Sequence, residues 1–244
     1  MLHRAALPLV ALWPGFARRR GMPALLRAPP SRRQVSGKRA GGGYTPQMRV
    51  IGGELKRRRL QAPAGLATRP SSDRLRETLF DILGGAVRGG VFVDAFAGSG
   101  AVGIEAWSRG ARPVVWIETA RAALQQLRAN LEGLGIATAG GATVLARPVL
   151  PAMPGLERLP GVAGHGCDFF FLDPPYADEP EYGRVLAELD RRPGLLAPGA
   201  RVVAEAHRSA ALPEAVGGLL RERVHRVGDS ALVFYRASGG ANRV

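Results

Sequence analysis

The chain has 244 residues and a formal net charge of +14, from 34 basic against 20 acidic side chains. Residues 1–47 carry nine of the basic side chains and no acid, so the rest of the chain is only mildly basic. The length accommodates one sizeable domain with an extension, and the single cysteine, Cys167, excludes an internal disulfide and a cysteine-based zinc site.

The first 47 residues are expected to lie outside the folded domain. Their apolar run, Ala5–Trp13, is too short to span a bilayer, and arginines follow it where a signal peptide would need a cleavage pattern. We interpret residues 1–47 as a disordered or targeting extension, or as translated sequence before a start at Met48. The folded domain is then expected over residues 48–238, with a short tail at 239–244.

A basic arm, defined here as residues 48–70, opens the predicted domain. Its run Lys56-Arg57-Arg58-Arg59 is predicted to be strand-like and, together with Arg49, suits contacts with phosphate groups. The alternative is a solvated charged face. After the arm, apolar residues recur at helical spacing and predict an amphipathic helix over 72–83.

A glycine-rich segment follows the next predicted strand, Val91–Asp94. Gly98–Gly103 matches the pattern G-x-G-x-x-G and opens a predicted helix, Ala101–Ser108. Glu118 ends a second predicted strand 20 positions after Gly98, which is the spacing of a dinucleotide fold. A nicotinamide-dependent oxidoreductase is therefore one hypothesis. However, the acid Asp94 suits a cationic sulfonium cofactor with a free ammonium group better than a pyrophosphate.

The remaining predicted elements alternate between strand and helix. After the strand Val114–Ile117 we expect a helix marked by leucines 124 to 134, and later a turn at Pro198-Gly199 and a hairpin around Gly228-Asp229. The other predicted elements are strands at Thr143–Ala146, Asp168–Leu172 and Arg201–Glu205 and a helix at Glu181–Leu189. This alternation predicts an α/β fold, a doubly wound, mostly parallel, Rossmann-like sheet with a C-terminal antiparallel hairpin.

The tetrapeptide Asp173-Pro174-Pro175-Tyr176 follows the apolar strand at 168–172, at the sheet edge where ligands bind. Asp173 can accept a hydrogen from an exocyclic amino group. The prolines remove two backbone donors and fix φ, so that the carbonyl of Pro174 can serve as a second acceptor. Tyr176 offers a flat face on which a base can stack. The alternative is a proline-rich turn with Asp173 as the first residue of a helix.

Together these motifs resemble the class I S-adenosylmethionine-dependent methyltransferases, and within them the RsmD family. The glycine segment and the tetrapeptide are shared by many amine methyltransferases. The segment Arg69–Phe80 (RPSSDRLRETLF) is more specific to the family, and the resemblance extends from Met48 to about Arg236. It implies methyl transfer from S-adenosyl-L-methionine to the N2 amine of a guanine in small-subunit (16S-type) rRNA.

The resemblance also implies roles for individual residues. The tetrapeptide 173–176 is expected to be catalytic, and no metal is expected. The residues expected to bind the cofactor are Asp94, Phe96, Ala97, Gly98, Gly100 and Glu118. Those expected to bind RNA are Arg49, Lys56, Arg57, Arg58, Arg59, Arg69 and Arg76.

This chain departs from the family pattern at two places. Thr119-Ala120 follows Glu118 where the family often has a second acid, and Arg147-Pro148 follows the third strand where a polar or acidic residue is common. We therefore expect backbone groups to recognise the adenine of the cofactor.

Three other interpretations stay open: a DNA adenine-N6 methyltransferase, which usually has an added target-recognition domain, the nicotinamide oxidoreductase, and a non-catalytic RNA-binding or assembly factor. The expected partner is ribosomal RNA within a small-subunit assembly particle, and no membrane is expected as a partner. We expect a cytoplasmic monomer, or an organellar protein if residues 1–47 are a transit peptide.

Overall fold

The computed structural model describes residues 48–61, 70–136, 140–175 and 179–238. Expectations that concern residues 1–47, residues 239–244, Arg69 and Tyr176 lie outside this part of the chain. The described elements are α1 (Pro70–Leu83), the 3-10 helix η1 (Gly84–Val87), β1 (Phe92–Ala95), α2 (Ala101–Ser108), β2 (Val114–Glu118), α3 (Arg121–Gly133), β3 (Ala142–Ala146), α4 (Val149–Leu156), β4 (Cys167–Leu172), α5 (Glu179–Arg191), β5 (Leu196–His207), β6 (Ala215–Val216), β7 (Leu219–Val227) and β8 (Ser230–Ala237).

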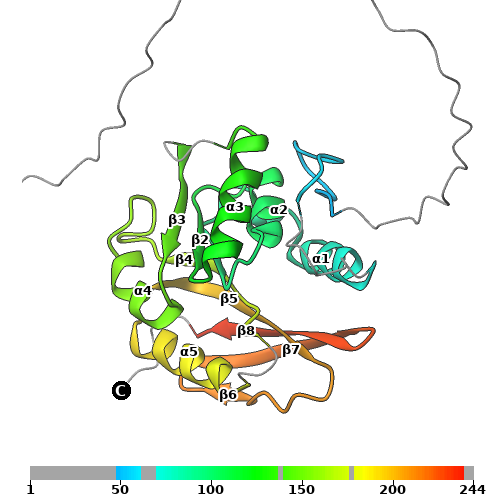
Figure 1. Cartoon of the computed structure of the whole chain (residues 1–244). Coiled ribbons are helices and arrows are strands. Elements are labelled where there is room, and N and C mark those ends of the chain that lie inside the picture. The colour runs from blue at the N-terminus through cyan, green and yellow to red at the C-terminus, as the bar shows by residue number, and fades with distance from the viewer. Residues whose placement is uncertain (1–47, 62–69, 137–139, 176–178, 239–244) are drawn as a thin grey trace, which may run out of the picture. The chain divides into compact units, whose positions relative to one another are not determined.

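Eight strands of the described residues form one sheet in the order β3-β2-β1-β4-β5-β8-β7-β6 (Figure 1). The first five strands in this order pair in parallel. β8 lies antiparallel to β5, and β7 and β6 continue the antiparallel half. β7 and β8 form the hairpin expected around Gly228-Asp229. The predicted fold class is therefore confirmed.

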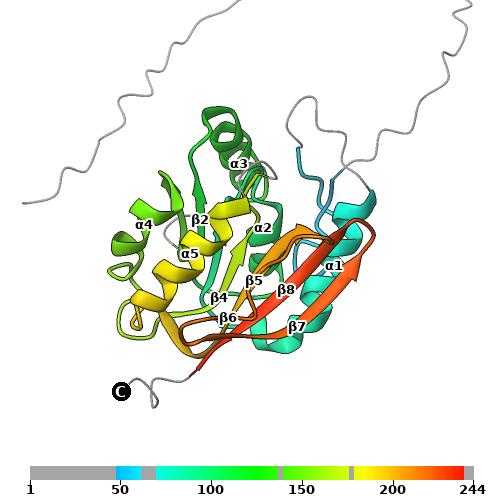
Figure 2. The same ribbon diagram turned by 90° about the horizontal axis from the view of Figure 1, so that it is seen from below.

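Helices cover both faces of this sheet (Figure 2). On one face, called here the α1 face, α1, α2 and α3 bury a cluster that includes Phe80, Ile104 and Leu127. On the opposite face, called the α5 face, α4 and α5 pack on a cluster that includes Met153 and Leu186. Such a two-sided core is typical of doubly wound sheets. None of the helices in the described ranges is long and apolar enough to cross a membrane.

Two local features differ from the sequence-based expectations. The turn expected at Pro198-Gly199 is wrong, because both residues lie within β5. The pairing register between β4 and β5 shifts there, since β4 advances from Cys167 to Phe169 while β5 advances by five residues. The chain thus makes a bulge at this point and still continues the same strand.

The other difference is α4, which the sequence did not predict. Its sequence VLPAMPGL contains Pro151 and Pro154, which are helix-breaking signals in general. Pro151 lies in the first turn, where a backbone N–H has no partner within the helix. The short helix forms because its apolar side chains, including Met153 and Leu156, are buried on the α5 face.

Candidate active site

The predicted site residues meet at the carboxyl edge of the parallel strands, where the strand order reverses. β1 pairs with β2 on one side and with β4 on the other. The loop after β1 and the segment after β4 therefore open beside each other, and such a crevice is where ligands bind in α/β sheets. We call residues Phe96–Gly100, which follow β1, the glycine loop.

The backbone of the glycine loop turns back over β2. Phe96 and Ala97 both donate their N–H to the carbonyl of Ile117, at 3.1 and 2.9 Å. Phe96 has a φ of 77°, which is uncommon for a residue with a side chain. Strained backbone of this kind concentrates at functional sites, which agrees with the predicted role of the loop.

The two glycines that were expected to bind cofactor have different surroundings. Gly98 has a φ of 54°, and no described atom lies within 4 Å of the position that a Cβ would occupy. A ligand could therefore approach its backbone closely. A Cβ on Gly100 would lie 2.3 Å from Cδ1 of Leu127. The packing of α3 against the loop is thus sufficient to require glycine at position 100.

Asp94 lies at the end of β1 and is only 2% exposed. Its Oδ2 accepts a hydrogen bond from the N–H of Gly103 in α2, at 2.8 Å. Desolvation raises the pKa of Asp94 to about 7, the hydrogen bond from Gly103 opposes the rise, and the charge of Glu118 adds to it. A positively charged ligand nearby would favour the ionised form of such an acid.

The raised pKa of Asp94 predicts a specific dependence of stability on pH. The folded protein keeps the proton up to about pH 7, whereas the unfolded chain releases it near 3.8. The free energy of unfolding therefore falls as the pH rises between these values. The variant Asp94→Asn has no carboxyl group at this position, so its free energy of unfolding does not show this fall with pH. We expect the melting temperature of the variant, relative to wild type, to rise by several degrees from pH 4 to 7 and then level off. A difference that does not change with pH in thermal scans would contradict the assignment.

Glu118, at the end of β2, hydrogen-bonds both to the glycine loop and to the two residues that follow it in the chain. Its Oε2 accepts from the N–H of Gly98 at 2.8 Å, and its Oε1 accepts from the N–H groups of Thr119 and Ala120 at 2.7 Å each. These two backbone donors orient the carboxylate. A carboxylate offers about four acceptor positions, so Glu118 can also accept from a ligand hydroxyl.

Asp173 and Pro174 directly follow β4, whose last residue, Leu172, pairs with Ala95 of β1 and Ala204 of β5. Pro174 is buried, whereas Asp173 as a whole residue is exposed. Protein packed around this carboxylate still desolvates it, which is the largest cause of a pKa well above the ordinary value. The charges of Glu205 and Asp94 raise the pKa of Asp173 further.

Glu205 is a site residue that the sequence analysis did not assign. It lies near the carboxyl end of β5, and desolvation raises its pKa to about 7, against the hydrogen bond from Ser230 and the charge of Arg76. The signal was present, because Glu205 follows an apolar strand segment in the same way as Asp94 and Glu118. Within the described residues, no group of three or more His, Cys, Asp and Glu side chains is arranged to hold a metal ion.

Arg76 differs from the other residues predicted to bind RNA, because its side chain is buried in the described structure. It is 3% exposed, and its guanidinium donates to the carbonyl of Arg49 and to Asp73, each at 2.8 Å. Desolvation lowers its pKa, against the charges of Asp73, Glu105 and Glu205. Arg76 therefore lies near Asp73, Glu105 and Glu205, where its charge offsets theirs. Its guanidinium is not a free cation on the surface.

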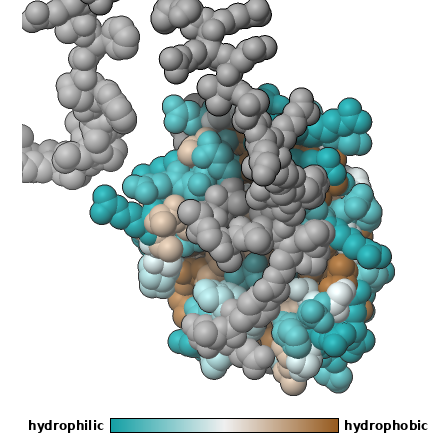
Figure 3. All heavy atoms as spheres, turned by 45° about the vertical axis from the view of Figure 1, so that its right-hand side comes forward, coloured by the Kyte–Doolittle hydropathy of each residue, from teal (hydrophilic) through white to brown (hydrophobic). Residues whose placement is uncertain are grey.

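Residues 49–59 of the basic arm form a closed turn, and the strand-like expectation is correct only at the two ends of this turn. Arg49 and Arg59 make an isolated antiparallel bridge, and residues 54–57 turn between them. Lys56, Arg57 and Arg59 are exposed. Arg58 is also exposed, but its guanidinium donates to the carbonyl of Gly133 at 2.9 Å. The view toward the arm and α1 shows a mostly hydrophilic described surface (Figure 3).

Two buried polar residues that were not predicted hold the arm in place. Glu105 of α2 is fully buried and accepts from the N–H groups of Ile51 and Gly52, both at 2.7 Å. Asn130 of α3 bonds both backbone groups of Gln61, and its amide also donates to the carbonyl of Ser99 in the glycine loop at 3.0 Å. The arm and the glycine loop are therefore tied to one another.

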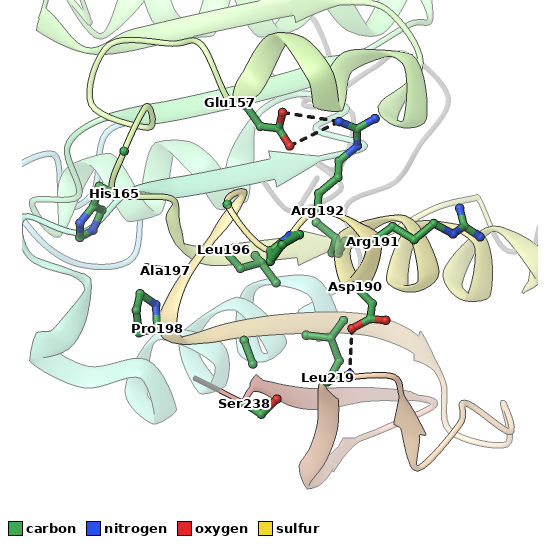
Figure 4. Close-up of a pocket in the computed structure, with 16 residues that line it drawn as sticks. Glu157, His165, Asp190, Arg191, Arg192, Leu196, Ala197, Pro198, Leu219 and Ser238 are labelled. Atoms are coloured by element: carbon green, nitrogen blue, oxygen red, sulfur yellow. Dashed lines mark hydrogen bonds and ion pairs between the residues drawn. The ribbon is translucent and has the colours of Figure 1, made fainter. Parts of the chain in front are cut away.

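A cavity of about 730 Å³ lies at the opposite edge of the sheet, beside the amino end of β5 (Figure 4). Its charged side chains already have partners. Arg192 contacts both oxygens of Glu157 at 3.4 and 3.5 Å, and Asp190 accepts from the N–H of Gly218 at 2.8 Å. None of the residues in the predicted site lines this cavity.

Comparisons with known proteins agree on one family. The family model described as "Conserved hypothetical protein 95" matches residues 48–236. "Putative rRNA methyltransferase YlbH" of Bacillus subtilis is 35% identical over 193 residues, which are 79% of this chain and 100% of that protein. "Ribosomal RNA small subunit methyltransferase D" of Escherichia coli is 41% identical over 130 residues, 53% of this chain and 61% of that protein.

A solved structure extends this agreement to the fold. "Putative methyltransferase yhhF from Escherichia coli" matches with a TM-score of 0.65 and 34% identity, over 80% of this chain and 99% of that chain. The residues matched by the family model include the whole predicted site, from Arg49 to Tyr176, as well as Glu205.

Proposed function

Because this chain belongs to the RsmD family, whose model is described as Conserved hypothetical protein 95, we propose that it methylates ribosomal RNA. The reaction is transfer of a methyl group from S-adenosyl-L-methionine to the exocyclic N2 amine of a guanine in small-subunit rRNA. The observation that supports this most is the position of Asp173 and Pro174, beside the glycine loop at the carboxyl edge of the sheet.

The residues of the glycine loop fit the proposed cofactor. The open space over Gly98 allows close approach of a ligand, and Glu118 is oriented at the end of β2 to accept ribose hydroxyls. Asp94, Asp173 and Glu205 make the surroundings acidic. A sulfonium and an ammonium group favour the ionised form of these acids and are attracted to it, whereas the pyrophosphate of a nicotinamide cofactor would be repelled by it.

Asp173 and the carbonyl of Pro174 would act on the amine. The lone pair of an amine conjugated to a ring is delocalised, so the nitrogen is a weak nucleophile. Two acceptors that bind its two hydrogens favour a pyramidal nitrogen and make the lone pair available. When bound, S-adenosylmethionine supplies the methyl group, and its carbon–sulfur bond breaks with the electron pair going to sulfur as the nitrogen–carbon bond forms.

The proton that the nitrogen must lose passes to the carboxylate of Asp173. Burial and the neighbouring acids raise the pKa of Asp173, so its carboxylate is a stronger proton acceptor than an ordinary one. Because Asp173 is an exposed residue, the proton can then pass to water. Tyr176 is proposed to stack on the target base once that base is turned out of its helix or loop.

The role proposed for Glu118 predicts a selective defect in Glu118→Ala. The variant loses a carboxylate that would bind ribose hydroxyls, so we expect S-adenosylmethionine affinity to fall by about 10- to 100-fold. RNA affinity should change much less, because the cations proposed to bind RNA lie on another segment of the chain. Isothermal calorimetry measures the first quantity and a filter-binding titration the second. Equal losses in both would argue for general unfolding of the site.

The proposed partner is rRNA within a small-subunit assembly particle, with the exposed cations of the arm on the phosphate backbone. Arg49, Lys56, Arg57 and Arg59 are the described residues proposed for this contact. Arg69 is proposed for the same contact. The enzyme is proposed to act as a monomer where ribosomes are assembled, in the cytoplasm, or in an organelle if residues 1–47 are a targeting segment.

The experiment that tests this function uses purified protein, a labelled methyl donor, and three substrates: free small-subunit rRNA, assembly particles, and duplex DNA. We expect mass spectrometry of the digested product to show N2-methylguanosine from one of the two RNA substrates. N6-methyladenine from DNA would instead support the DNA methyltransferase. No transfer to any substrate, together with binding of a nicotinamide cofactor in calorimetry, would support an oxidoreductase.

A further inference from the structure

We propose that Glu205 determines the choice of base, by accepting the N1–H of guanine next to the amine that Asp173 holds. This inference rests on the proposed function and adds to it a residue that selects guanine against adenine. It follows from the position of Glu205 in the sheet, from its neighbours, and from the hydrogen-bonding edge of guanine.

The pairing of the strands places Glu205 beside Asp173. Leu172 of β4 pairs with Ala204 of β5, so the next residues of the two strands are neighbours. Adjacent strands lie about 4.8 Å apart. The two carboxylates are close enough for the charge of Glu205 to be the largest charge effect on Asp173.

Strand alternation directs the side chain of Glu205 to the α1 face. Phe171 and Val203 pair across β4 and β5 and are both buried in the cluster of the α1 face. Side chains two positions apart on a strand share a face, so Glu205 points to the α1 face as well. Asp173, the residue directly after β4, interacts with the charges of Glu205 and Asp94. Leu232, which pairs with Glu205 from β8, lies in the same cluster.

The surroundings of Glu205 hold its carboxylate but leave it able to accept more hydrogen bonds. Its backbone carbonyl accepts from the hydroxyl of Tyr182, which fixes the strand from the α5 face. Its carboxylate accepts from Ser230 and lies near the charge of Arg76. A carboxylate offers about four acceptor positions, so Glu205 can also accept from a ligand.

The chemistry of guanine matches two neighbouring carboxylates. Its edge presents the two N2 hydrogens and, one ring position away, the N1 hydrogen, so three donors stand in a row. Asp173 and the carbonyl of Pro174 would take the N2 hydrogens, which leaves N1–H for the carboxylate beside them. Adenine instead has a lone pair on N1, and a carboxylate facing it would be repelled and left unpaired.

The test compares two RNA substrates in three proteins. One RNA has the guanosine that the methylation assay identifies, and the other has 2-aminopurine there, which keeps the 2-amino group but has an acceptor at N1. The proteins are the wild type, Glu205→Gln, and the control Glu222→Gln. Glu222 is an exposed acid on β7 that pairs with Arg201 at 3.2 Å.

For each protein the ratio of kcat/KM for guanosine over 2-aminopurine is measured. A charged hydrogen bond to N1–H is expected to contribute about 10- to 100-fold to this ratio. We expect the full contribution in wild type and in Glu222→Gln, and a clearly smaller one in Glu205→Gln, whose amide oxygen can still accept N1–H but carries no charge. Any general damage from the substitution lowers both rates and cancels in the ratio. The same ratio is measured without turnover, from RNA dissociation constants in the presence of S-adenosylhomocysteine.

An unchanged ratio in Glu205→Gln, by both measurements, would overturn the role of Glu205 while leaving the proposed methyltransferase intact. Failure of the wild type to methylate any guanosine would overturn the proposed function and this role with it. The two failures are therefore distinguishable from the wild-type data alone.

Discussion

Asp173→Ala is expected to lower the rate of methyl transfer by about 10³-fold or more while leaving S-adenosylmethionine affinity within a few-fold of wild type. The reason is that Asp173 is assigned to the amine of the base and not to the cofactor. Removing one well-placed group that stabilises a transition state commonly costs about 10²–10³-fold, and here the proton acceptor is lost as well. Single-turnover rates at saturating RNA measure the effect, and calorimetry measures cofactor binding.

Two further variants sharpen this test. Asp173→Asn keeps a carbonyl acceptor but cannot take the proton, so it should lose less activity than the alanine variant. Glu132→Ala removes an exposed acid on α3, away from the sheet edge, and should behave as wild type. Undiminished single-turnover rates in Asp173→Ala would remove the proposed mechanism.

The second large effect is expected from the arm. Replacing Lys56, Arg57 and Arg59 together by glutamine should weaken rRNA binding and flatten its salt dependence. Each lost phosphate contact should reduce the slope of log affinity against log salt by about 0.7–0.9 units. Arg58→Gln should flatten the slope less, because that guanidinium already binds the carbonyl of Gly133. Filter binding across a salt series measures the two variants and the wild type.

Removal of residues 1–47 provides the contrast for this experiment. That segment holds nine of the 34 basic residues of the chain, yet it precedes the residues matched by the family model. We expect catalysis on rRNA and the salt slope to stay close to wild type after the deletion. If the deletion flattened the slope and the arm variant did not, the RNA-binding surface would lie in residues 1–47.

Much of this fold could be predicted because its signals are local. The alternation of apolar strands and helical repeats predicted β1 to β5 and all the described α-helices except α4. Glycines and acids at strand ends located the site, since strand ends in a parallel sheet meet at one edge. The helix α4 was missed because Pro151 and Pro154 contradict helix locally, and only burial on the α5 face outweighs them.

The residues that hold the site together could not be predicted, because their roles depend on segments distant in sequence. In the sequence, Glu105 is a single acid within an apolar helix. In the structure, it accepts hydrogen bonds from two backbone N–H groups of the arm, which lies more than 50 positions earlier in the chain. In the sequence, Arg76 is one of several cations in a basic region, whereas in the structure its side chain is buried. The role proposed for Glu205 depends on the pairing of β4 with β5, which brings it close to Asp173. Long-range pairing of this kind leaves no periodic trace in the sequence.

The position of β8 bears on how the protein matures. Residues 230–237 lie between β5 and β7, although they follow both strands in the chain. During synthesis, β5 therefore emerges before the strand that closes its free edge, and Glu205 emerges before the Ser230 that hydrogen-bonds to it. A nascent chain that ends before β8 exposes an unpaired strand edge, the kind of surface on which aggregation starts. The strand neighbours of Glu205 are therefore complete only once residues 230–237 have been synthesised.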